Sequence, residues 1–343
     1  MTTSSSRKPH ALITGGAGFI GSHLTDKLIA DGYTVTVLDD LSTGRWENIA
    51  HLEHHPRFQF AIEDIRNEMV MDRLVSTCDV VFHLAAAVGV KLIVENPINT
   101  IEVNIRGTEI VLKTALRYRK RVLIASTSEV YGKSNRVPFK ETDDGVYGAT
   151  TKSRWSYAVS KSMDEFLALA YFEAQNLPVT IFRLFNTVGP RQVGHYGMVV
   201  PRFIQAALSG EAIQVYDDGQ QTRCFGNVFD VVDAITRLSE SPNTLGEVYN
   251  IGSTEEITIL ELAQRIRAAA HSKAEITHIS YEDAYKKGYE DMRRRVPDTG
   301  KIKAAIGWQA STPLYTTIEQ MIDYFRKVDV EPALPNSLHT GTD

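Results

Sequence analysis

Short apolar runs alternate with helix-length amphipathic segments along the first half of this chain. An apolar run at 11–13 precedes a glycine-rich turn, and an apolar stripe at every fourth position from Ile20 to Leu28 predicts a helix after it. The run 34–38 predicts a second strand, which ends at Asp39. Strand, helix and strand within about 30 residues form one βαβ unit.

The same alternation continues beyond this unit. Further short apolar runs, separated by helix-length segments such as 103–118, are found at 58–62, 80–82, 122–125 and 179–182. Alternating strands and helices predict an α/β fold, a Rossmann-type doubly wound parallel sheet with ligands at the carboxyl ends of its strands.

The second half of the chain follows a looser pattern, with clear helices predicted at 258–269 and 316–326. We therefore expect four parts, taken in order along the sequence. They are a Rossmann domain at 1–188, a segment at about 226–252 that returns to it, a smaller interleaved substrate-binding part at 189–330, and a loose tail at 331–343.

Composition narrows the class of protein. The 343 residues are 43% hydrophobic and 23% charged, as in an ordinary globular protein, and the net charge of −5 argues against nucleic acid and membrane surfaces as partners. Cys78 and Cys224 can form no disulfide framework, and no apolar run is long enough for a membrane span, so we expect a cytoplasmic protein. The histidines in 51–55 lack further ligands at coherent spacing, so no metal is expected.

Glycines at 15, 18 and 21 lie between the first strand and the first helix. The first permits a tight turn, the second lets backbone amides approach a pyrophosphate, and the third lets the helix pack closely on the strand. Asp39 lies 18 residues after Gly21, where a carboxylate accepts hydrogen bonds from a ribose and repels a 2′-phosphate. The pattern therefore predicts NAD rather than NADP, although the nearby positive charge of Arg45 speaks for NADP.

The spacing G-x-x-G-x-x-G resembles the short-chain dehydrogenase/reductase superfamily, as do the segments Asp64-Ile65, 83–86 and 104–108. The resemblance implies a set of cofactor contacts. These are Gly15, Gly18, Phe19, Ile20, Gly21, Asp39, Ser42, Thr43, Gly44, Asp64, Ile65, Leu84, Ala85, Ala86, Asn104, Tyr157, Lys161 and Val188.

Tyr157 and Lys161 are four residues apart, hence on one face of a predicted helix. A tyrosine is a poor base at neutral pH, but an ammonium beside it lowers its pKa and favours the phenolate. This pair alone also fits a solvated helix face. Thr127, which follows the run 122–125, is suited to bind the same hydroxyl as Tyr157, and so completes the Ser/Thr, Tyr and Lys triad of the superfamily.

From about Ala11 to Phe325 the chain resembles the extended short-chain dehydrogenases that act on nucleotide sugars. This resemblance rests on the motifs R-x-x-N-x-x-G-P at 183–190 and Q-T-R-C-F at 221–225. The resemblance implies contacts with a UDP-sugar substrate. These come from Ser128, Glu129, Asn186, Arg191, Tyr216, Gln221, Arg223 and Arg295.

Glu129 helps to distinguish between the reactions that such an enzyme could catalyse. On an extended stretch it would point to the same side as Thr127. UDP-galactose-type epimerases usually lack an acid here, whereas sugar 4,6-dehydratases and UDP-glucuronate decarboxylases usually carry one. The segments K-x-R-W-x-Y at 152–157 and G-Y-x-D…R-x-P at 288–297 also resemble the decarboxylases, while the loop 138–151 matches no single group. A glutamate that only orders its loop is the alternative.

These residues predict an NAD-dependent decarboxylase that converts UDP-glucuronate into UDP-xylose or its 4-keto form through transient oxidation at C4. Its catalytic groups would be Thr127, Glu129, Tyr157, Lys161 and Arg223. A UDP-sugar 4-epimerase, a 4,6-dehydratase and a non-catalytic NAD-binding sensor are the alternatives. The family resemblance also implies a homodimer formed through the helices that contain Tyr157 and 103–118.

Overall fold

The computed structural model describes residues 8–89, 96–194, 198–280 and 292–328. The 288–291 part of the G-Y-x-D motif and the predicted tail at 331–343 therefore lie outside the described residues. Within them, the main sheet has seven strands, all parallel. Their order across the sheet is β11 (Glu247–Ile251), β6 (Val179–Leu184), β5 (Arg121–Thr127), β4 (Val80–His83), β1 (His10–Thr14), β2 (Thr34–Asp39) and β3 (Phe58–Ile62).

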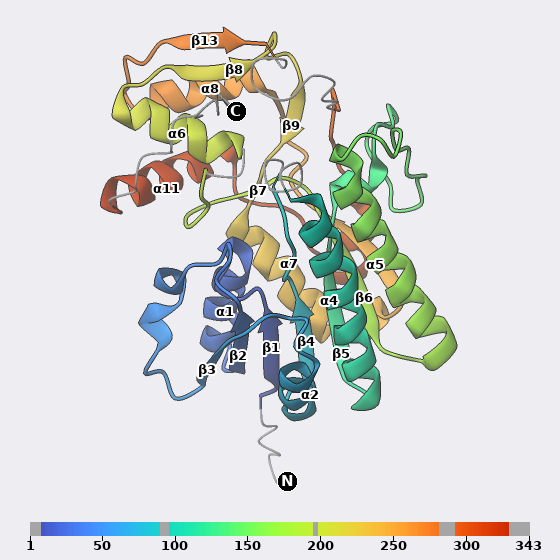
Figure 1. Ribbon diagram of the computed structural model, residues 1–343. Helices are drawn as coiled ribbons and strands as arrows, with labels where there is room; N and C mark the ends of the chain where they lie inside the picture. Colours follow the sequence, from blue (N-terminus) through green and yellow to red (C-terminus); the bar gives the residue numbers. More distant parts are fainter. Residues whose placement is uncertain (1–7, 90–95, 195–197, 281–291, 329–343) are drawn as a thin grey trace, which may run out of the picture.

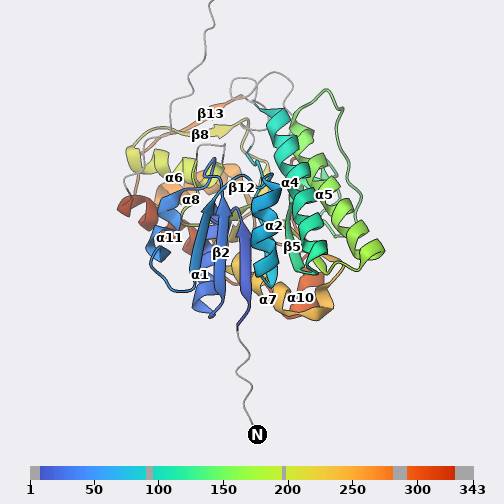
Figure 2. The same cartoon turned by 60° about the horizontal axis from the view of Figure 1, so that its bottom comes forward.

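Helices cover both faces of this sheet (Figures 1 and 2). One face packs against α1 (Phe19–Ala30), α7 (Val228–Glu240) and α10 (Gly300–Ile306). The other face packs against α2 (Glu68–Thr77), α4 (Pro97–Arg117) and α5 (Arg154–Gln175). The strands are apolar runs rather than alternating ones because both of their faces are buried.

A smaller part lies above the carboxyl ends of the strands, at the top of Figure 1. Its helices α6 (Val199–Ser209), α8 (Ile259–Ala269) and α11 (Leu314–Lys327) share one apolar core. Three two-stranded sheets accompany it. They are β8 (Ile213–Tyr216) with β13 (Ile276–Ile279), β9 (Thr222–Cys224) with β12 (Glu256–Thr258), and β7 (Thr187–Val188) with β10 (Gly226–Asn227).

The chain returns to the main sheet between two segments of this smaller part. Helix α7 packs beside α1, and β11 then pairs with β6 in parallel. The cavity described below lies between the sheet and the smaller part, so residues distant in sequence form its walls.

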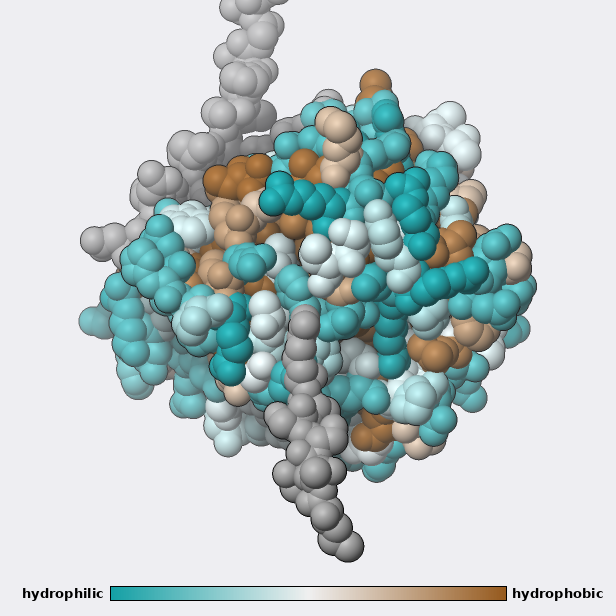
Figure 3. All heavy atoms as spheres, turned by 90° about the horizontal axis from the view of Figure 1, so that it is seen from below, coloured by the Kyte–Doolittle hydropathy of each residue, from teal (hydrophilic) through white to brown (hydrophobic). Residues whose placement is uncertain are grey.

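The predicted α/β class with a parallel Rossmann-type sheet is confirmed. One helix differs in extent, because α4 begins at Pro97 rather than near residue 103. Proline at the first turn of a helix removes no hydrogen bond, and this allows the earlier start. The face opposite the smaller part is largely hydrophilic (Figure 3). Among the described helices, none combines the length and the apolar character needed to cross a membrane.

Candidate active site

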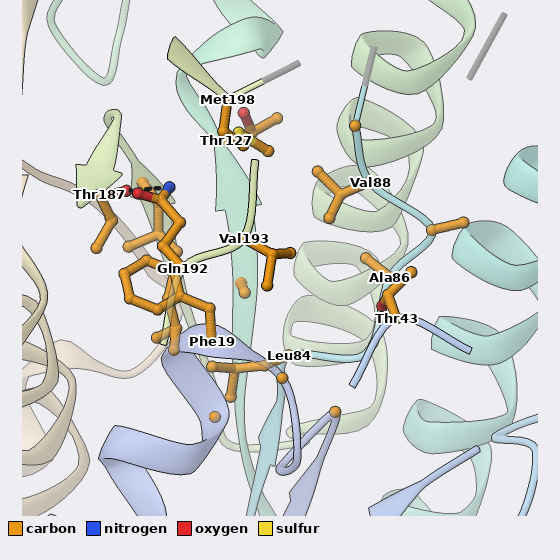
Figure 4. A pocket seen from close by; sticks show the side chains of 18 of the residues that line it. Phe19, Thr43, Leu84, Ala86, Val88, Thr127, Thr187, Gln192, Val193 and Met198 are labelled. Atoms are coloured by element: carbon orange, nitrogen blue, oxygen red, sulfur yellow. Dashed lines mark hydrogen bonds between the residues drawn. The ribbon is translucent and has the colours of Figure 1, made fainter. Parts of the chain in front are cut away.

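A cavity of about 590 Å³ opens at the carboxyl ends of β1, β2, β4 and β5. Figure 4 shows Phe19 and Leu84 beside the start of α1, with Val193 above them and Thr127 and Met198 at the top of the view. The cavity is therefore long. It runs from the glycine turn after β1 to the smaller part above the sheet.

The glycine turn leaves no room for side chains. Gly15 has φ +72°, and a Cβ placed on it would lie 2.8 Å from the Ala85 amide nitrogen. A Cβ on Gly21 would lie 2.1 Å from the Gly15 carbonyl oxygen, so the start of α1 packs directly on the turn. Gly18, Phe19 and Ile20 at the N-terminus of α1 line the cavity, and a helix N-terminus is suited to bind a pyrophosphate.

Asp39 is held rigidly at the end of β2. Its two carboxylate oxygens accept hydrogen bonds from the Ala17 amide (2.9 Å) and the Leu41 amide (2.9 Å). Burial raises the pKa of this carboxyl, and the two amide hydrogen bonds oppose the rise. Gly44 passes close behind it, since a Cβ there would lie 2.6 Å from Asp39 Oδ1.

Two residues expected near the adenine end have partners within the protein. The Asp64 carboxylate accepts hydrogen bonds from the guanidinium of Arg66, with Nε 2.9 Å from Oδ1, and both residues line the cavity. Asn104 lies behind the wall, where it accepts from the Ala87 amide (2.9 Å) and donates to Ser160 Oγ (3.2 Å). Asn104 thus braces the cavity wall.

The expected triad converges on one side of the cavity. Thr127 is the last residue of β5, and Tyr157 and Lys161 lie one turn apart on α5. Burial raises the pKa of the Tyr157 phenol, and the charges of Glu129 and Asp164 raise it further. Hydrogen bonding to Thr127 opposes this rise.

The lowering of the Tyr157 pKa by Lys161 stays a prediction, and the structure shows a buried partner for the Lys161 ammonium. The Lys161 ammonium is buried and donates a hydrogen bond to Asp164 Oδ2 at 2.7 Å. A carboxylate this close offsets the charge that would otherwise stabilise a phenolate.

Glu129 lies in a cluster of guanidinium groups. Its carboxylate is ion-paired with Arg154, the first residue of α5, and Arg295 Nη1 lies 3.7 Å from Oε1. Burial alone would raise the pKa of this carboxyl, but Arg154, Arg295 and Arg223 together hold it below its ordinary value. Glu129 is thus ionised at neutral pH.

The predicted extended backbone at Glu129 is wrong. Strand β5 ends at Thr127, and a short 3₁₀-helix, η3 (Ser128–Tyr131), follows. Thr127 caps this helix, since its hydroxyl accepts from the Glu129 amide at 3.2 Å. The turn still brings Glu129 to the cavity because α5 packs against η3 and carries Arg154 to it.

At the substrate end of the cavity, several of the residues predicted to contact the substrate have partners within the protein. Arg191 Nη2 is paired with Asp26 of α1 at 2.8 Å, although its Nη1 has no hydrogen-bond partner among the described residues. Asn186 donates to the Cys224 carbonyl at 3.0 Å. Tyr216 lies under the Arg202 guanidinium, 4.2 Å from the ring centre.

Most of the residues predicted to contact ligands line this one cavity. Gly44 and Asn104 do not, and both lie behind its wall. The lining includes Gly15, Gly18, Phe19, Ile20, Gly21, Asp39, Ser42, Thr43, Asp64, Ile65, Leu84, Ala85, Ala86, Thr127, Ser128, Glu129, Tyr157, Lys161, Asn186, Val188, Arg191, Tyr216, Gln221, Arg223 and Arg295.

Sequence reasoning assigned no role to two charged residues of α5. Arg154 is three residues before Tyr157 and pairs with Glu129, and Asp164 is three residues after Lys161 and pairs with it. Helical spacing alone places Arg154 and Asp164 on the same face as Tyr157 and Lys161. The sequence therefore contained the information needed to find them. Among the described residues, no group of three or more His, Cys, Asp or Glu side chains could hold a metal ion.

Comparisons with known proteins identify relatives of this chain. Residues 12–321 match the family described as GDP-mannose 4,6 dehydratase. The chain is 45% identical to a UDP-N-acetyl-alpha-D-glucosaminuronate decarboxylase of Bacillus cytotoxicus, over 94% of this chain and 99% of the relative. It is 38% identical to UDP-glucuronic acid decarboxylase 1 of Danio rerio, over 92% of this chain and 72% of the relative.

A solved structure has the same fold. The UDP-glucose 4-epimerase of Thermus thermophilus, in complex with NAD, superposes with a TM-score of 0.81. It is 30% identical in sequence, and the match covers 92% of this chain and 99% of that one.

Proposed function

This chain belongs to the GDP-mannose 4,6-dehydratase family of extended short-chain dehydrogenases, and from that premise we propose that it is an NAD-dependent decarboxylase of UDP-hexuronates. The curated relatives support the reaction, because both named above are decarboxylases of UDP-linked uronates. They differ in the substituent at C2 of the sugar. UDP-glucuronate and its 2-acetamido analogue are therefore the two substrates to test.

The cluster around Glu129 carries this proposal. Three guanidinium groups, those of Arg154, Arg223 and Arg295, act on a single carboxylate beside Tyr157. A cluster of guanidinium groups suits a substrate that brings a carboxylate to the side of the cavity where C4 would be oxidised.

The residues present fit NAD. The glycine turn has no space for a Cβ at Gly15 or Gly21, and the N-terminus of α1 lines the cavity. The Asp39 carboxylate is positioned for ribose hydroxyls and disfavours a 2′-phosphate. When bound, NAD would supply a hydride acceptor for C4 and a donor for the return step.

Tyr157 and Thr127 act on the sugar 4-hydroxyl. Tyr157 removes its proton as C4 becomes a ketone, and the Thr127 hydroxyl donates a hydrogen bond to the oxygen that bears the developing charge. The C6 carboxylate is then β to a ketone, so the C5–C6 bond breaks with its electron pair left at C5. Carbon dioxide leaves, and a proton is added at C5.

The charged groups control this second step. Arg223 and Arg295 hold the uronate carboxylate, while the ionised Glu129 stays fixed by Arg154. A second carboxylate facing that of the substrate disfavours its charged form. This repulsion is relieved when the carboxylate leaves the sugar as uncharged carbon dioxide. Glu129 then takes up a proton from water and passes it to C5.

Two copies of the chain are proposed to pair through α4 and α5. Apolar side chains on these helices are exposed in the single chain, including Ile98 (71%) and Phe166 (71%). Val159 and Met163 add to this face of α5. Light scattering on the native protein and on Phe166→Glu tests this, with a dimer expected for the first and a monomer for the second.

The reaction is tested by incubating purified, NAD-supplemented protein with UDP-glucuronate, UDP-N-acetylglucosaminuronate or UDP-glucose, and recording product masses. Loss of one carbon dioxide from either uronate is the expected result. A product lighter by two further hydrogens identifies the released 4-ketone. An unchanged mass with a new retention time indicates epimerisation, loss of water indicates dehydration, and either outcome overturns the proposal.

A further inference from the structure

A buried carboxylate lies beneath the catalytic lysine. Asp164 follows Lys161 by three residues on α5, and Lys161 Nζ lies 2.7 Å from Asp164 Oδ2. The Asp164 side chain has no exposed surface and that of Lys161 is 3% exposed. Taking both charges out of water costs free energy that their attraction only partly returns, so a buried pair is weak evidence for a purely stabilising role.

Uncharged groups surround this pair. The His83 ring of β4 lies between Thr14 Oγ1 (2.9 Å) and Thr108 Oγ1 (2.9 Å). Burial lowers the pKa of His83 to about 3, and the Lys161 charge adds to this, so the ring is neutral. Asp164 Oδ1 has no hydrogen-bond partner among the described residues. Burial raises the pKa of the Asp164 carboxyl, and Lys161 and the Thr108 hydroxyl oppose that rise.

The charged groups that act on the phenol come from two elements, η3 and α5. Tyr157 is affected by Glu129 from η3 and by Arg154 and Asp164 from α5. Glu129 and Arg154 are themselves an ion pair and so largely cancel each other. Glu165, the next residue after Asp164, is neutralised by Arg183 of β6 at 2.7 Å. Asp164 is thus the remaining anion that raises the pKa of Tyr157, and it lies against the Lys161 ammonium.

We propose that Asp164 is a positioning residue, which holds the Lys161 ammonium by its carboxylate and so sets the pH at which the Tyr157 phenol gives up its proton. The Lys161 side chain is held in place because its hydrogen-bond partner is buried with it. The phenol is the base for the sugar hydroxyl in the function proposed above, on which this inference rests in part. Asp164 would thereby place the working range of the enzyme at higher pH than an unpaired lysine would.

The direction in which Asp164→Asn changes the pKa of Tyr157 follows from the charge that it removes. Asn at position 164 has almost the same shape as Asp but no charge. Removing the anion favours the phenolate directly, and it also frees the ammonium to approach the phenolate oxygen. Both effects act in the same direction. The phenol of Asp164→Asn should therefore ionise at lower pH than that of the native protein.

The test is a spectrophotometric titration of the Tyr157 phenol, obtained as the difference between each protein and its Tyr157→Phe counterpart, with and without NAD. For Asp164→Asn we expect a midpoint lower by roughly one pH unit, which is about tenfold more phenolate at a given pH. The rising limb of kcat/KM against pH should move down with it. An unchanged or higher midpoint overturns the proposal, because a merely structural role would leave the midpoint in place.

Two further variants complete the test. Asp164→Ser also removes the charge and carries the same expectation, so the proposal remains testable should Asn at this position prevent folding. Asp72→Asn is the matched control, since Asp72 pairs with Arg117 at the surface, and its titration should equal that of the native protein. If no uronate is converted by the native protein, the proposed function fails, while the phenol titration still decides the role of Asp164.

Discussion

Replacing Arg154 by Gln removes the ion-pair partner of Glu129 without removing the glutamate. The Glu129 side chain is 14% exposed and that of Arg154 is 5% exposed, so the carboxylate is left in a site that excludes most water. Breaking a buried pair in this way costs roughly 3–5 kcal/mol. Because Arg295 remains 3.7 Å away, we expect the lower end of that range, about 3 kcal/mol near pH 7.

The loss of unfolding free energy caused by Arg154→Gln should depend on pH. In the native protein the pKa of Glu129 is lowered, so its contribution to stability is present above the unfolded-state pKa and is lost as pH falls through the folded-state pKa. In Arg154→Gln, burial raises the pKa instead, and stability is lost as pH rises from the unfolded-state value to the folded-state one. The difference in unfolding free energy should therefore grow between about pH 4 and pH 7.

Urea unfolding of both proteins at several pH values measures this difference, and the pH profile of carbon dioxide release measures its effect on turnover. Release by the variant should fall, with its rising limb at higher pH. Arg294→Gln is the matched control, because Arg294 pairs with Glu256 at the surface and should cost less than about 1 kcal/mol at any pH. A penalty for Arg154→Gln that is the same at both ends of the pH range would refute this reasoning.

Three other changes test the rest of the site. Tyr157→Phe should abolish turnover, about 100-fold or more, while NAD affinity measured by calorimetry stays near the native value. Gly21→Ala should destroy NAD binding, because its Cβ would lie 2.1 Å from a carbonyl oxygen. Gly210→Ala has open space but a left-handed φ of +79°, so it should lose some stability and still bind NAD normally; equal NAD affinities of the two variants would contradict the assignment of the turn. Asp39→Asn should narrow the preference for NAD over NADP by about tenfold in fluorescence titrations, and an unchanged ratio would show that Asp39 does not discriminate.

The parallel sheet could be predicted because strands buried on both faces are continuous apolar runs, and because helices follow most of the first strands, such as α1 after β1 and α2 after β3. The glycine turn and Tyr157 with Lys161 were visible for a similar reason, since short-range spacing determines which groups share a face. Asp39 was found by its place at the end of a strand.

Other features depended on contacts between distant segments. Sequence spacing did not reveal that Arg191 would be drawn to Asp26, 165 positions earlier, or that Lys161 would be neutralised within its own helix. The turn at Glu129 was mispredicted because the Thr127 side chain caps a helix, which local apolar alternation does not report. Charge balance inside a buried site is a property of the assembled fold.

The late return of the chain to the main sheet has a consequence for synthesis. Strand β6 acquires its outer neighbour only when β11 (Glu247–Ile251) arrives, more than sixty residues after β6 ends. Until then a nascent chain presents the backbone of β6 as an unpaired edge, open to pairing with other chains. A fragment that stops at residue 188 would keep that edge permanently, so the cofactor-binding half is expected to aggregate when it is produced alone.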